Sequence, residues 1–230
     1  AHYNGRDTDG DGDISDHVDG DAVTSIIDSD NSFLDIEHST DFDAVGVTYS
    51  ANGINGYGAL DFSNATAGFG GTTTALESPE AERRAWGGVF KTGSNVDGRQ
   101  IIYEEGGGGT GYSIAISSGH FIMSLYTSDA GDARVLDLGL INENTTYAFL
   151  NHYDSADGFF RGYINGVLAA ELSATFTFKG HGNPYGIGVV AQHASVYNFD
   201  TSAIEHLGAG SEVTTNVARF TGLIGEIFAW

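Results

Sequence analysis

The chain of 230 residues carries 31 acidic side chains against 9 lysines and arginines, a formal net charge of -22, with 40% hydrophobic residues and no cysteine. This charge repels nucleic acid and anionic membranes, so we expect neither a nucleic-acid partner nor membrane insertion. The sequence has no apolar run approaching the roughly 20 residues that span a bilayer. The missing cysteines argue against a disulfide scaffold, and 12% aromatic residues argue against global disorder.

The first predicted element is a calcium site in the acidic stretch DTDGDGDISD, residues 7–16. Aspartates at alternate positions of a tight turn converge on a hard divalent cation, which takes about six to eight oxygen ligands. In the register of an EF-hand loop, Val18 stands where a bidentate glutamate belongs, so Asp16 or Asp19 must complete the shell. The alternative is a solvated acidic linker. The expected calcium ligands, with a stabilising role, are Asp7, Asp9, Asp11, Asp13, Asp16 and Asp19.

Two regions follow from this reading. Residues 1–43 are expected to form an acidic calcium-binding segment that packs on, or leads into, a binding domain of residues 44–230. From about residue 45 onward, short runs of alternating apolar and polar residues predict β-strands. A short helix is expected only near residues 78–85, where Ser78 caps and Pro79 takes the first helical position.

The next signal is the glycine-rich stretch EEGGGG, residues 104–109. It contains a GxGxxG spacing, but a dinucleotide site also needs a helix after the glycines, and the next residues read as a strand. We instead expect a β-turn loop whose backbone approaches a ligand or an ion. One of the two carboxylates is expected to point into the sandwich and the other outward, and a structural role for the pair stays open. The predicted ligand-binding residues here are Glu104, Glu105, Gly108 and Gly109.

Three later stretches predict strands and their faces. In HFIMSLY, residues 120–126, Phe121, Met123 and Leu125 share one face. In YINGVLAAEL, residues 163–172, Asn165 and Gly166 predict a type I′ hairpin turn. The last run, residues 220–230, is expected to bury Phe220, Ile224 and Phe228 together. Roughly a dozen strands in all predict an all-β, two-sheet sandwich or jelly roll.

A long connection, residues 192–216, mixes aromatics, amides, acids and histidines. Loops of this length in compact domains tend to be functional. Tyr197 and Phe199 are expected to stack on a ligand, while Asn198 and Asp200 hold a calcium ion that in turn takes a carboxylate or hydroxyls. The alternative is an ordered surface loop. We predict that this connection and the turn at residues 104–111 converge on one rim of the sandwich.

Four blocks carry a resemblance to known proteins: RRAWGGVFKTG, RQIIYEEGGGGTGYSIAISSGHFIMSLY, TTYAFLNHYDSADGFFRGYINGVL and FTGLIGEIFAW. Together, over residues 45–230, they resemble the laminin-G-like branch of the concanavalin A-like lectin/glucanase superfamily. More narrowly, they resemble the ligand-binding modules of giant bacterial repeats-in-toxin (RTX) adhesins, some of which bind peptides. The resemblance implies a concanavalin A-like jelly roll with calcium-binding loops.

Catalytic patterns are missing from the sequence. Jelly-roll glucanases place paired carboxylates on one strand as ExDxxE; the nearest match, FLDIEH with Asp35 and Glu37, lacks the third acid. Neither GxSxG nor a zinc-type HxxEH spacing occurs. Together with the acidic composition, the resemblance implies a non-catalytic, calcium-dependent module that binds a peptide or glycan on target cells, as a monomeric part of a long secreted adhesin on a bacterial cell surface. The alternative is a polysaccharide hydrolase or lyase.

Overall fold

The computed structural model describes residues 2–4, 17–23, 44–71, 83–106, 109–127, 132–173, 185–190, 193–208 and 218–229. Within these ranges every regular element is a β-strand, and no helix there is long and apolar enough to cross a membrane. The strands are β1 (His2–Asn4), β2 (Thr48–Ile54), β3 (Tyr57–Asp61), β4 (Phe69–Gly71), β5 (Arg83–Lys91), β6 (Arg99–Gly106), β7 (Thr110–Ser117), β8 (His120–Thr127), β9 (Asp132–Leu140), β10 (Thr146–Asp154), β11 (Phe159–Ile164), β12 (Val167–Ser173), β13 (Tyr185–Ile187), β14 (His193–Asn198), β15 (Ala203–Gly208), β16 (Ala218–Arg219) and β17 (Leu223–Ala229).

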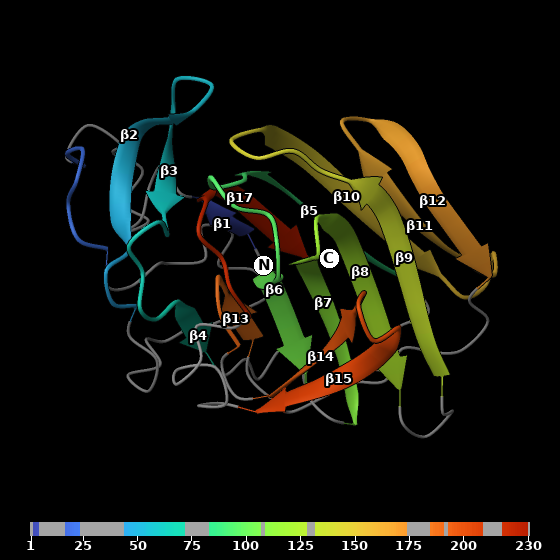
Figure 1. Ribbon diagram of the computed structural model, residues 1–230. Helices are drawn as coiled ribbons and strands as arrows, with labels where there is room; N and C mark the ends of the chain where they lie inside the picture. The colour runs from blue at the N-terminus through green and yellow to red at the C-terminus, as the bar shows by residue number, and fades with distance from the viewer. Residues whose placement is uncertain are drawn as a thin grey trace.

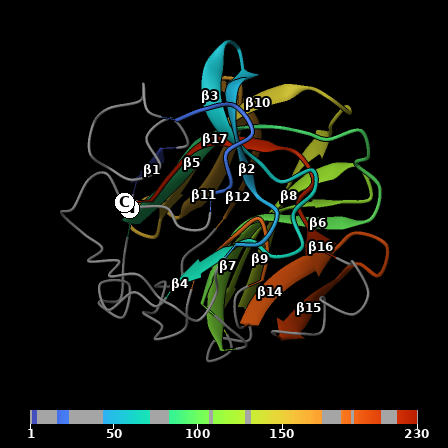
Figure 2. The same ribbon diagram turned by 90° about the vertical axis from the view of Figure 1, so that its left-hand side faces the viewer.

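Two large sheets form a sandwich (Figures 1 and 2). The first has the order β12-β11-β10-β5-β17-β3-β2, and β1 also pairs with β17, so strands from both ends of the chain lie side by side. The second has the order β4-β13-β6-β7-β8-β9, with β16 beside β6. Strands β14 and β15 form a separate two-stranded sheet. This order confirms the predicted two-sheet architecture.

Aromatic rings from both sheets fill the space between them. Trp86 of β5 stacks on Tyr112 of β7 with ring centroids 3.9 Å apart, and Phe90 of β5 packs 5.0 Å from Phe121 of β8. All four side chains are fully buried. Burial of large rings on both inner faces is what holds the two sheets together.

The predicted alternation of inward and outward side chains is confirmed in β8. Phe121, Met123 and Leu125 of β8 lie together in the core. Asn165 and Gly166 form the turn between β11 and β12 with φ angles of 51° and 79°. Positive φ at both positions is what a type I′ turn requires, and asparagine followed by glycine tolerates it best.

Two local predictions are wrong. Arg83, Arg84 and Ala85, expected in a short helix, open β5 instead. Phe220, just before β17, and Ile224 within it are buried as predicted, but Phe228 is half-buried on the outer face and Ile227 takes the inward position. The reason is a register shift between Ile224 and Glu226, which moves the later residues of β17 by one position and so exchanges their faces.

The described parts of the N-terminal region belong to the sandwich. Strand β1 extends the first sheet, Ala22 forms a β-bridge with Thr48, and Val23 is buried in the core. His17 packs its ring 5.3 Å from the ring of Tyr49. Residues on both sides of the predicted boundary at 43/44 therefore share one core.

Candidate functional site

The predicted pair Glu104 and Glu105 lies inside β6, with exposures of 0% and 1%. Glu105 points between the sheets, where its Oε1 accepts hydrogen bonds from Arg84 Nη1 at 3.2 Å and Trp86 Nε1 at 3.3 Å. Its Oε2 accepts one from the Tyr103 hydroxyl at 2.9 Å. Burial, and then the charge of Glu105, hold the pKa of Tyr103 well above its usual value.

One of the two carboxylates thus points into the sandwich, as expected, but the other does not reach solvent. Glu104 lies opposite Ser113 on the outer face of the second sheet, and the Ser113 hydroxyl donates to the Ser195 carbonyl of β14, which covers this face. Neither carboxylate is at the surface, where a ligand would meet it. Gly108 lies outside the described residues, and Gly109 is exposed beside the start of β7.

The connection expected to be a loop contains a β-hairpin, β14–β15, which lies across the outside of β6, β7 and β8 (Figure 1). Val196 of β14 packs against Ile101 and Ala115 of the sheet. Two serine hydroxyls of the sheet accept hydrogen bonds from backbone amides of this segment: Ser124 from Tyr197 at 3.1 Å and Ser117 from Phe199 at 3.0 Å. The hairpin is therefore anchored by both apolar and polar contacts.

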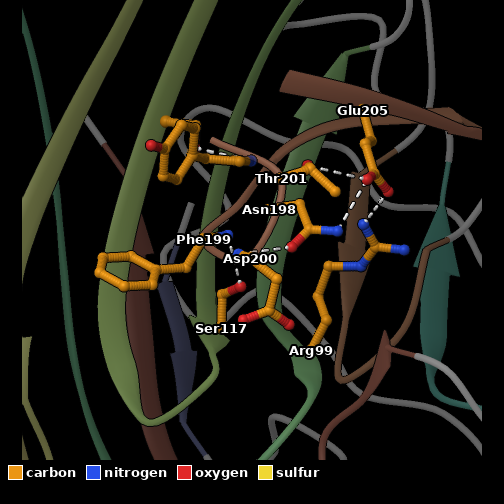
Figure 3. A network of polar contacts seen from close by, with 9 residues as sticks. Arg99, Ser117, Asn198, Phe199, Asp200, Thr201 and Glu205 are labelled. Atoms are coloured by element: carbon orange, nitrogen blue, oxygen red, sulfur yellow. Dashed lines mark hydrogen bonds and ion pairs between the residues drawn. The ribbon is translucent and has the colours of Figure 1, made fainter. Parts of the chain in front are cut away.

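Glu205 organises the turn that joins the two hairpin strands (Figure 3). Its Oε1 accepts hydrogen bonds from Asn198 Nδ2 at 2.7 Å and Thr201 Oγ1 at 3.3 Å, and its Oε2 forms an ion pair with Arg99 at the start of β6. Asn198 Oδ1 in turn accepts the Asp200 backbone N–H at 3.0 Å. The Glu205 carboxylate thus links the end of β14, the hairpin turn and the start of β6.

Beside this turn lies a polar and aromatic surface. The Phe199 ring stacks on His120 with centroids 3.7 Å apart, and His120 Nδ1 lies 3.0 Å from the Asp137 carboxylate. Asp200 is exposed, and its Oδ1 accepts a hydrogen bond from the Ser118 hydroxyl at 2.7 Å. We call this set the tip surface; its members are Ser118, His120, Asp137, Tyr197, Phe199 and Asp200.

The structure does not bring the two predicted groups of ligand-binding residues to one rim. Phe199 contacts Ser117, the last residue of β7, whereas the glycine turn adjoins Gly111 near the start of that strand. Six residues of strand separate these ends, about 20 Å at roughly 3.3 Å per residue. Tyr197, Asn198, Phe199 and Asp200 do lie together. Ser118, His120, Asp137, Arg99 and Glu205 were missed, because pairing between distant segments leaves no local sequence signal.

The predicted calcium ligands are only partly within the described residues. Asp7, Asp9, Asp11, Asp13 and Asp16 lie outside them. Asp19 Oδ1 accepts the Ala51 backbone N–H at 2.9 Å, which links residue 19 to β2. Within the described part of the chain, no group of three or more His, Asp or Glu side chains is arranged to hold a metal ion, Asp200 included. Calcium binding therefore stays a prediction.

Replacing Glu205 by glutamine is expected to loosen the hairpin while the sandwich stays folded. The hydrogen bond from Arg99 is the main reason that the pKa of Glu205 is lowered. The stabilisation is therefore complete above the usual glutamate pKa near ~4.3 and is lost as the pH falls through the lowered pKa. At pH 7 the amides of β14 should exchange about fivefold faster in Glu205→Gln, which corresponds to roughly 1 kcal/mol.

Hydrogen exchange followed by mass spectrometry measures this effect, and Glu171→Gln is the matched control. Glu171 forms a similar ion pair with Arg161, but on β11 and β12, away from the hairpin. The control should leave β14 exchange unchanged. If Glu205→Gln leaves it unchanged too, or if the excess exchange persists in acid where Glu205 is protonated, the assigned role of this carboxylate is wrong.

Comparison with known proteins supports the fold. No protein-family model and no curated protein sequence matches the chain. Domain 4 of AbnA, an extracellular arabinanase from Geobacillus stearothermophilus in complex with arabinotriose, is similar over 100% of this chain and 90% of that chain, with 13% identity and a TM-score of 0.55. A structure of botulinum neurotoxin type C, which enters cells through interaction with two ganglioside molecules, covers 86% of this chain and 46% of its own, with 11% identity and a TM-score of 0.50.

Mouse laminin α1 domains LG4-5 match with 12% identity and a TM-score of 0.47, and the chain spans 36% of that laminin chain. At these identities the similarity concerns the fold. Two packed β-sheets with this strand order and these structural neighbours make the domain an all-β sandwich of the concanavalin A-like jelly-roll type.

Proposed function

We propose that this domain is a non-catalytic glycan-binding module and that the tip surface is its binding site. The observation that carries the proposal is the hairpin turn, which presents the exposed Asp200 carboxylate beside the half-buried rings of Tyr197 and Phe199. The turn is joined to the second sheet by the hydrogen bond from Phe199 to Ser117 and by the ion pair of Glu205 with Arg99. Support comes from two structural neighbours, one in complex with arabinotriose and the other interacting with gangliosides.

The chemistry of the tip surface suits a sugar. A pyranose or furanose ring has apolar C–H faces, which stack on aromatic rings, and hydroxyl edges, which donate to carboxylates. The Phe199 ring stacks on the His120 ring, and this contact holds it in one orientation. Asp200 and Asp137 both accept hydrogen bonds and both are exposed. The support of these side chains by β-strands keeps the cost of ordering them on binding low.

Calcium is part of the proposal. The ion would be held at residues 7–19, where it stabilises the chain, and at Asp200, where open coordination positions would take sugar hydroxyls or a peptide carboxylate. A calcium ion also reverses the local sign of a chain with a net charge of -22. An extracellular setting, in a bacterial adhesin of the RTX type, agrees with this composition.

The test is an array of glycans and peptides, read in calcium and in chelator. Phe199→Ala and Asp200→Ala should each weaken glycan binding at least tenfold, which is about 1.4 kcal/mol, with little change in melting temperature. The matched controls are Tyr57→Ala, an exposed ring on β3, and Asp157→Ala, an exposed acid on the β10–β11 turn. Both controls should bind like the wild type.

Three outcomes would decide against parts of the proposal. If the domain binds peptides and no glycan, the proposed ligand class is wrong. If chelator does not change binding, the proposed role of calcium in binding is wrong. Loss of viscosity or release of reducing ends from a soluble polysaccharide would favour the hydrolase or lyase alternative. The acids of that alternative, Asp35 and Glu37, lie outside the described residues.

A further inference from the structure

The outer face of the first sheet carries a continuous apolar row. Phe228 of β17 lies opposite Gly87 of β5, which lies opposite Leu150 of β10. Leu150 lies opposite Tyr163 of β11, and Tyr163 lies opposite Leu168 of β12. Directly opposed residues share a face, so the row crosses five adjacent strands. We call it the outer row.

The outer row is exposed although it is apolar. Leu150 is 38% exposed and Leu168 is 48% exposed. Tyr163 is half-buried. Leucines at these exposures are no surprise singly, but here they are neighbours in register and form one contiguous apolar patch.

The outer row is also flat at its β5 position. Gly87 has no side chain, and a Cβ placed there would collide with the Phe228 ring, so that ring lies directly over the β5 backbone. Ala85 and Ala148, small residues on the same face, flank it. An aromatic ring lying over a glycine, with alanines beside it, gives a shallow platform rather than a ridge.

Polar side chains lie beside the outer row, several on one side and Glu226 on the other, where Val89 and Ala148 complete the line across the strands. Two residues along the strands on one side, His152 lies opposite Arg161, which forms an ion pair with Glu171. Two residues along on the other side, Glu226 of β17 occupies the same face. The polar borders are about 13 Å apart at roughly 3.3 Å per residue, and the row is about 19 Å long at ~4.8 Å per strand.

The acids of this face are few and paired. Strands β5, β10, β11 and β12 contain two acids, Asp154 and Glu171, and each is ion-paired, with Arg83 at 2.9 Å and with Arg161. Lys91 adds a further base. These four strands therefore carry no net negative charge, although the chain as a whole has a net charge of -22. It suits a partner that carries no positive charge.

We propose that the outer row is a second binding surface, which takes a neutral polysaccharide chain lying across the strands. Sugar rings would lay their C–H faces on Tyr163, Leu150 and Phe228, and their hydroxyls would reach the polar borders. The footprint, on the order of 250 Å², is far below the ~800 Å² per partner of a stable protein interface, which argues against a second copy of the chain as the occupant. This proposal shares its ligand class with the tip surface but not its residues.

The experiment is affinity electrophoresis in gels that contain soluble arabinan or β-1,3-glucan, with polygalacturonate as the anionic comparison. The wild type should be retarded by one of the neutral polymers. Tyr163→Ala should weaken that retardation at least fivefold, while Tyr57→Ala, an exposed tyrosine at the β2–β3 turn and outside the outer row, should not. Phe199→Ala should keep retardation by the polymer, even where it loses short oligosaccharides on the array.

Other results would overturn the inference. If Phe199→Ala abolishes all retardation and Tyr163→Ala behaves like the wild type, the tip surface is the sole site and only the proposed function stands. If no neutral polymer retards the wild type but oligosaccharides bind, the outer row fails alone; if no glycan of any length binds, both proposals fail. Light scattering should give the 24.2 kDa of one chain. Twice that mass, reduced to one chain by Leu150→Glu, would make the outer row a self-association surface.

Discussion

Replacing Arg84 by alanine is expected to lower the free energy of unfolding by about 3–5 kcal/mol. The Arg84 and Glu105 side chains are 8% and 0% exposed, and Arg84 Nη1 lies 3.2 Å from Glu105 Oε1. Removing the guanidinium takes the positive charge away from a buried carboxylate, which keeps the hydrogen bonds from the neutral donors of Trp86 and Tyr103. A buried charge without its counter-charge is among the costliest defects in a protein interior. Denaturant unfolding at pH 7 measures the loss.

Arg161→Ala is the matched control for this prediction. Arg161 also forms an arginine–glutamate ion pair, with Glu171, but both side chains are about a third exposed. Pairs in solvent contribute about 0–1 kcal/mol, so this variant should stay within that range. If the two variants lose equal free energy of unfolding, the charge of Glu105 is stabilised by other groups and does not depend on Arg84.

Replacing Phe90 by alanine is expected to cost about 3–5 kcal/mol. The Phe90 ring is fully buried and lies 5.0 Å from Phe121, 6.0 Å from Phe149 and 6.0 Å from Phe220. These three neighbours come from β8, from β10 and from the segment between β16 and β17, and so from both sheets, which means that they cannot all move inward to fill the space. The cavity term therefore adds to the lost transfer free energy.

Thermal and denaturant unfolding measure this loss, with Leu140→Ala as the control. Leu140 is 76% exposed at the end of β9 and should change the stability by no more than about 0.5 kcal/mol. A loss below about 1.5 kcal/mol in Phe90→Ala would mean that the core relaxes around the missing ring.

Local sequence patterns determined the strands and most of their faces. Side chains alternate across a strand at every residue, so the order of residues in HFIMSLY was enough to place Phe121, Met123 and Leu125 together. The turn at Asn165 and Gly166 followed from the φ angles that these two residues tolerate. Both inferences depend on a few neighbouring residues, and the structure confirms both.

The same patterns failed where a distant contact intervenes. Glu105 was expected near a ligand, but its charge is balanced by Arg84, 21 residues earlier in the chain. Phe228 was expected in the core, but a register shift in β17 moved it to the outer face. Neither event is encoded by the residues nearby, because each depends on which strands become neighbours.

What the sequence determined by itself is the all-β class, the alternation of most strands and the strong negative charge. What only the tertiary structure decided is the position of the candidate site: the segment 192–216, read as a loop, contains a hairpin, and Phe199 and Asp200 lie beside Ser117 and Ser118, 82 residues earlier. The physical reason is the distance along the sequence over which each interaction acts. Backbone preferences and side-chain alternation act over a few residues, whereas strand order depends on the packing of the whole core, which brings distant segments together.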